Sequence, residues 1–173
     1  MNKELREIGS FSVNNKKSQL ILYIMFLIIA GLGVGIIFLT KVYTNNNIPI
    51  WVIILSVIAL IIVHELIHII FMSIFSKGKI IVSVKFPTIE VGSNKHFNKF
   101  QYIFIALSPV VILGIISLIC LLLLPYKLLF VILLILNFAT AAGDYILTFH
   151  ALKQKKNTYF VDNANNTIVY DKF

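Results

Sequence analysis

Three ionisable side chains lie within five residues of one another inside a long apolar run. The segment V-H-E-L-I-H-I, residues 63–69, places His64 and His68 four residues apart. In a helix this spacing puts both imidazoles on one face, one turn apart and about 40° from each other. Two imidazoles so placed can hold one Zn²⁺, and Glu65 can accept a proton from a water that the metal activates. The pattern is H-E-x-x-H, which is typical of zinc peptidases.

The alternative is that these three residues are structural polar groups of a buried helix. A charged side chain at the centre of a membrane-spanning helix costs roughly 2.5–3.5 kcal/mol on insertion scales. Three such groups so close together need a compensating partner, which a bound cation and a water-filled cavity would supply. The setting therefore favours a metal site.

The composition requires the bilayer as solvent. The 173 residues are 59% hydrophobic and 13% charged, with a mean hydropathy of +0.94, and a soluble core cannot cover that much apolar surface. The length fits a single domain, 1–173. Cys120 is the only cysteine, so no intrachain disulfide is expected. The net charge of +8 is explained by membrane topology, and we expect no nucleic acid among the partners because no aromatic-plus-basic pattern accompanies it.

Four apolar runs are long enough to cross a bilayer as helices. They cover about residues 19–40, 48–75, 101–124 and 128–152. The first run exceeds the apolar segment of a signal peptide and lacks a following cleavage site, so we expect an uncleaved helix. Gly31 and Gly35, with Gly33 between them, indicate either a close packing face or ordinary glycine enrichment. In the third run, Ser108-Pro109 predicts a kink whose freed carbonyls need protein or cavity water as partners.

The polar segments contain two β patterns. Within the loop 76–100, residues 80–86 alternate with a period of two, which predicts a strand or hairpin over 79–91 at the membrane surface, with an irregular loop as the alternative. In the tail 153–173, two short β-prone stretches flank residues 163–166 and predict a small hairpin. The expected fold class is an all-α membrane protein with four transmembrane helices, a small β element in the cytoplasmic loop and a hairpin-like tail.

Basic residues set the expected topology. All Lys and Arg except Lys41 and Lys127 fall in the N-terminal segment, the 76–100 loop or the tail. The positive-inside rule then predicts a multi-pass protein of the cell membrane with both termini cytoplasmic.

This topology brings an acidic residue level with the histidines. The second and fourth runs point the same way, and His64 and Asp144 each lie sixteen residues after the start of their run, about 24 Å deep. Asp144 is therefore the predicted third ligand, leaving one open position on a catalytic zinc. The alternative is that Asp144 caps a helix or pairs elsewhere.

Other polar residues are weaker candidates. Asn137, seven residues before Asp144, shares its face and could stabilise an oxyanion, orient a substrate backbone or join two helices. We expect His96 to be solvated in the loop. His150 lies about 240° round the helix from Asp144 and should face away from the site.

Three motifs together carry a family resemblance: His64-Glu65-Leu66-Ile67-His68, Ser108-Pro109, and Asn137 with Gly143-Asp144. Over about residues 50–152 the chain resembles the zincin peptidase family of small membrane proteins, a domain family of unknown function. That family is similar to the site-2 protease class of intramembrane metalloproteases. Site-2 proteases usually have Asp-Gly and an earlier proline, where this chain has Gly143-Asp144 and Thr140.

The resemblance implies that His64, His68 and Asp144 bind zinc, that Glu65 is the general base, and that Asn137 matches the asparagine upstream of the family aspartate. It also implies that the 79–91 element holds substrate as an added strand. The expected function is hydrolysis of a membrane-embedded or membrane-proximal peptide near the cytoplasmic face, by a zinc-dependent intramembrane metalloprotease.

A non-catalytic membrane adaptor or immunity-type protein that retains the zinc-site scaffold is the alternative. A metal transporter is disfavoured, because residues 48–63 and 128–136 offer almost no polar path to the outer face.

Overall fold

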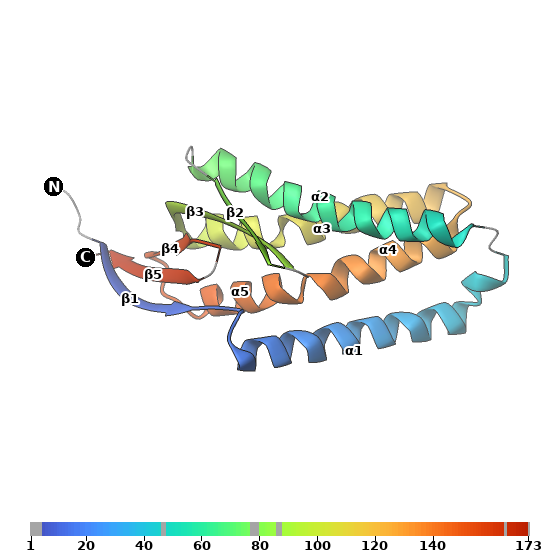
Figure 1. The fold of residues 1–173 in the computed structure, drawn as a ribbon, viewed down its shortest axis with the longest axis horizontal. Helices are drawn as coiled ribbons and strands as arrows, with labels where there is room; N and C mark the ends of the chain where they lie inside the picture. Colours follow the sequence, from blue (N-terminus) through green and yellow to red (C-terminus); the bar gives the residue numbers. More distant parts are fainter. Residues whose placement is uncertain (1–4, 46–47, 77–79, 86–87, 165, 173) are drawn as a thin grey trace.

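The computed structural model describes residues 5–45, 48–76, 80–85, 88–164 and 166–172. These residues form five α-helices, one short 3₁₀ helix and five strands. In chain order the elements are β1 (Leu5–Phe11), α1 (Lys16–Thr40), η1 (Val42–Asn45), α2 (Ile50–Ser76), β2 (Ile80–Lys85), β3 (Thr88–Asn98), α3 (Lys99–Leu123), α4 (Lys127–Thr140), α5 (Ala142–Leu152), β4 (Thr158–Asp162) and β5 (Thr167–Lys172). The helices run along the long axis of the molecule, and the strands gather towards one end (Figure 1).

Among the described residues, three helices are long and apolar enough to cross a membrane. These are α1, α2 and α3, with 25, 27 and 25 residues, and the pair α4 and α5 passes the same test if it forms one bent span. Large apolar side chains point outwards from these helices, including Leu27 at 67%, Leu39 at 86% and Leu123 at 77% exposure. Such a surface suits lipid better than water. The length and composition of the helices agree with the four predicted apolar segments.

The fourth apolar run is not the single helix predicted for residues 128–152. It breaks at Ala141, and α4 and α5 are bent by 43°. The Thr140 hydroxyl donates to the Leu136 carbonyl at 2.7 Å, and back-bonding of this kind bends helices. The break starts a new helix, so Asp144 lies in the first turn of α5, where the helix dipole favours a carboxylate.

The strands form one five-stranded antiparallel sheet, in the order β1-β5-β4-β3-β2. The two predicted hairpins are confirmed as β2–β3 and β4–β5, although residues 79, 86 and 87 of the first lie outside the described ranges. The fold is mostly helical, as predicted, but the two hairpins are parts of one sheet and not separate β elements. Pairing of β3 with β4 joins the hairpins, and β1, which the sequence did not predict, adds to β5.

The main core lies between the sheet and the adjacent ends of α2, α3 and α5. Its buried side chains are Met72, Phe97, Tyr102, Ile105, Ala151, Phe160 and Val169. Tyr102 of α3 stacks on Phe160 of β4, with 4.7 Å between ring centroids. Met72 lies one turn after His68 on α2, so the sheet holds the end of the helix that carries the histidines.

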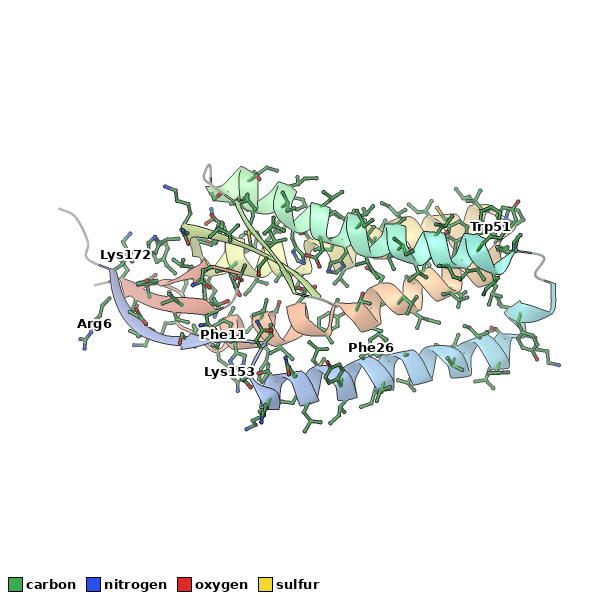
Figure 2. The ribbon with its side chains drawn as sticks, in the orientation of Figure 1. Arg6, Phe11, Phe26, Trp51, Lys153 and Lys172 are labelled. Carbon is green, nitrogen blue, oxygen red and sulfur yellow. The ribbon has the colours of Figure 1, made fainter. Side chains whose placement is uncertain are left out.

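The charged end of the molecule is the sheet end. Figure 1 shows β1 and β5 together there, with the α1–α2 and α3–α4 connections at the opposite end. In Figure 2, Arg6, Lys153 and Lys172 lie at the sheet end, whereas Trp51 lies at the other. The fold thus brings β1, β4 and β5 to one side, and the β2–β3 hairpin starts there and extends along the helices towards the break between α4 and α5 (Figure 1). That this side is cytoplasmic stays a prediction.

One glycine of α1 fits against a neighbouring helix. A Cβ at Gly33 would lie 2.4 Å from Cγ2 of Ile135 on α4, so only glycine allows the helices to be this close. Cβ atoms at Gly31 and Gly35 would meet nothing within 4 Å. The packing face considered for this helix therefore involves Gly33 and not the G-x-x-x-G pair.

Candidate metal centre

Helix α2 presents both histidines to the interior. His64 is 8% exposed and His68 is 9% exposed, and their ring centroids lie 5.1 Å apart at an interplanar angle of 74°. This follows from the four-residue spacing in a regular helix, which stacks the two positions one turn apart. Glu65 follows His64 directly, and its side chain is partly buried.

The bend between α4 and α5 brings Asp144 to these rings. Oδ2 of Asp144 lies 3.1 Å from Nε2 of His64, and Oδ1 lies 3.4 Å from Nε2 of His68. One carboxylate thus faces both imidazoles, with one oxygen for each. The ligand-type atoms of the three residues all lie within 4.8 Å of one another, and no other such group of three occurs in the described part of the chain.

The hydrogen bonds of His68 determine which nitrogen is available. Its Nδ1 lies 3.0 Å from the Ile105 carbonyl on α3. A carbonyl can only accept, so Nδ1 carries the proton and donates it. In the neutral ring, Nε2 therefore has a lone pair that points towards Asp144, which is the tautomer needed for binding a metal through Nε2.

These residues fit a zinc ion. An imidazole nitrogen that faces a carboxylate oxygen is satisfied either by a proton or by a metal ion between them. Two histidines with one carboxylate form a common catalytic zinc set. With bonds of about 2.0–2.2 Å, ligand atoms around a tetrahedral zinc are about 3.3–3.6 Å apart. The two imidazole-to-carboxylate distances, 3.1 and 3.4 Å, are close to this range.

Asn137 joins two helices. Its side chain is fully buried, and Nδ2 donates to the Val110 carbonyl on α3 at 2.9 Å. This contact matches the helix-joining alternative for Asn137. Its Oδ1 has no hydrogen-bond partner among the residues that the structure describes, and the same is true of Nδ1 of His64. A catalytic part for Asn137 stays a prediction.

The remaining histidines lie elsewhere. His96 is exposed on β3, with its ring 4.9 Å from that of Tyr170, and His150 stacks on Phe11 of β1 at 4.8 Å. Neither belongs to the His/His/Asp group, as expected. The residue that sequence reasoning missed is Ile105, which acts through its backbone. Its signal was present, since the predicted kink at Ser108-Pro109 implied a freed carbonyl.

The fold and site define a class: a mostly helical protein whose described residues form three or four apolar helices able by length and composition to cross a membrane, with a His/His/Asp cluster that could hold a metal ion. Residues 57–159, more than half of the chain, match the model of a family described as "Putative zincin peptidase". The chain belongs to this family. No curated protein and no solved structure matches it. The matched range contains all the predicted site residues, and the family description supports zinc and peptidase chemistry.

Proposed function

We propose that this protein is a zinc-dependent intramembrane metallopeptidase that hydrolyses membrane-embedded or membrane-proximal peptides near the cytoplasmic face. The observation that carries this proposal is the convergence of His64, His68 and Asp144 within 4.8 Å, in a chain of the zincin peptidase family. These three side chains would hold the ion and leave its fourth position open. When bound, zinc supplies a Lewis acid that activates water and polarises a peptide carbonyl.

Two neighbouring side chains supply the proton transfer and a contact to the substrate backbone. The Glu65 carboxylate accepts a proton from the attacking water and returns it to the leaving nitrogen. Asn137 holds α4 against α3 through Val110, and its Oδ1, which has no partner among the described residues, would accept a hydrogen bond from a substrate backbone N–H. Lipid and packed helices around the site limit bulk water, which strengthens these electrostatic interactions.

An extended substrate has a strand edge on which to add. Strand β2 is an edge of the sheet as described, whereas both sides of β3 are occupied by β2 and β4. The β2–β3 hairpin packs against α2, the helix that carries the histidines. Main-chain hydrogen bonds to β2 would supply affinity with little dependence on substrate sequence. The predicted partners are thus the lipid bilayer and a membrane protein or peptide substrate.

The test compares three full-length variants, purified in mild detergent and also expressed in cells. We expect Glu65→Gln to keep its zinc, measured by elemental analysis, and to lose all cleavage. Asp144→Ala should lose the zinc. Glu7→Gln, at an exposed position of β1, is the matched control and should behave as wild type.

Cleavage is measured by mass spectrometry of new peptide termini in membrane proteins of cells expressing each variant. Identical termini with wild type and Glu65→Gln would overturn the enzymatic proposal and favour a binding protein. Unchanged zinc content in Asp144→Ala would overturn the site.

A further inference from the structure

The Ile105 carbonyl accepts two side-chain hydrogen bonds inside a helix. His68 donates from Nδ1 at 3.0 Å, and the Ser108 hydroxyl donates at 2.9 Å. In a regular α-helix this carbonyl would accept from the backbone N–H four residues later. That residue is Pro109, which has no N–H and is almost completely buried within α3. The proline therefore leaves the carbonyl free for the histidine.

We propose that Pro109 is a positioning residue for His68. By withholding the backbone N–H, it reserves the Ile105 carbonyl for the Nδ1–H of His68 and so fixes the tautomer that presents Nε2 towards Asp144. The expected effect of Pro109 on metal binding rests on the proposed function. The imidazole orientation itself is a property of this chain with or without metal.

A backbone N–H at position 109 would compete with the His68 and Ser108 donors for the two lone pairs of the Ile105 carbonyl. An alanine at position 109 restores an N–H aimed along the helix axis at the Ile105 carbonyl, which then no longer depends on the imidazole. His68 has its other nitrogen 3.4 Å from a carboxylate, so a proton released from Nδ1 moves readily to Nε2. That tautomer blocks the nitrogen that faces the metal position. Loss of an outer-shell partner typically weakens metal binding by 10–100-fold.

The experiment measures zinc affinity, by competition with a chromophoric chelator, for the full-length protein in detergent. We expect Pro109→Ala to weaken zinc binding 10–100-fold. The matched variant has an alanine analogue at 109 with an ester in place of the amide, so its side chain is that of alanine but it has no N–H. It should bind zinc within about threefold of wild type. Ser108→Ala removes only the hydroxyl donor and leaves the Ile105 carbonyl to His68. It should also bind zinc within about threefold of wild type.

A second readout does not need metal. Histidine ¹⁵N spectra of the zinc-free protein, with His68 assigned from a His68→Gln sample, should show a protonated Nδ1 in wild type and in the ester variant. Pro109→Ala should shift the proton towards Nε2. Equal weakening by the alanine and ester variants, or an unchanged His68 tautomer in Pro109→Ala, overturns the inference. Failure of the wild type to bind zinc would refute the proposed function, while the tautomer comparison would still decide the part of Pro109.

Discussion

Asp162 should make the stability of the protein fall as pH rises through the weakly acidic range. Its carboxyl is 9% exposed at the end of β4, where it accepts from the hydroxyls of Tyr102 at 3.2 Å and Thr167 at 3.3 Å and from the Ala164 N–H at 3.2 Å. Burial outweighs these hydrogen bonds and raises the pKa of Asp162 from 3.8 to about 6. Between these values the folded chain keeps a proton that the unfolded chain has released.

The direction and the size of this change in stability follow from proton linkage. Where the folded state binds more protons, stability decreases as pH increases. A rise of two pKa units corresponds to about 3 kcal/mol. Below pH 4 the Asp162 carboxyl is therefore neutral in the folded chain and does not reduce the free energy of unfolding. Above about pH 6.5 it is ionised, and the full loss of stability is present. Replacing Asp162 with asparagine removes the titration while keeping a side chain that can hydrogen bond.

The assay is equilibrium unfolding of the full chain in mixed detergent micelles between pH 4 and 7, with chelator present throughout. We expect the stability of Asp162→Asn, relative to wild type, to increase by about 3 kcal/mol across this range. The difference between the two stabilities at each pH cancels the contributions of the other titrating groups, which both proteins share. Asp171→Asn, a partly exposed carboxyl on β5, is the control and should follow the wild-type profile. A relative stability of Asp162→Asn that stays constant within about 1 kcal/mol would refute the reasoning.

Two further predictions concern helix packing and capping. Gly33→Ala should destabilise the fold by about 1–3 kcal/mol relative to Gly31→Ala, because only the former forces a Cβ into Ile135; equal unfolding midpoints in detergent would contradict this. Lys99→Met should fray the end of α5, since the Lys99 ammonium donates to two carbonyls there at 2.8 and 2.6 Å; faster amide exchange confined to that end, measured by mass spectrometry, is the expected result, and unchanged exchange would count against it.

The sequence determined the parts of this protein that depend on local periodicity. Apolar runs of about twenty residues predict spanning helices, because in lipid the backbone must satisfy its own hydrogen bonds. A four-residue spacing places His64 and His68 on one helical face regardless of what surrounds the helix. Counting residues along two runs of the same direction placed Asp144 level with them, and the structure brings these three side chains together.

The sheet could not be read from the sequence with the same success. Both hairpins pair strands that are close in the sequence. The period-two alternation of residues 80–86 predicted the first, and two β-prone stretches on either side of the polar residues 163–166 predicted the second. The joining of β3 to β4, and of β1 to β5, pairs strands from distant parts of the chain. Nothing in the composition of Leu5–Phe11 indicates a partner more than 150 residues away, so its structure depends on the assembled fold.

The details of the site were likewise decided by tertiary structure. A proline predicts a freed carbonyl, but only the packing of α3 against α2 selects His68 as the donor that uses it. The bend at Ala141 turns the Asp144 carboxylate so that each oxygen faces one imidazole. The sequence specified which chemical groups are present and their depth along each helix. Their mutual orientation depends on contacts between helices, which no local pattern encodes.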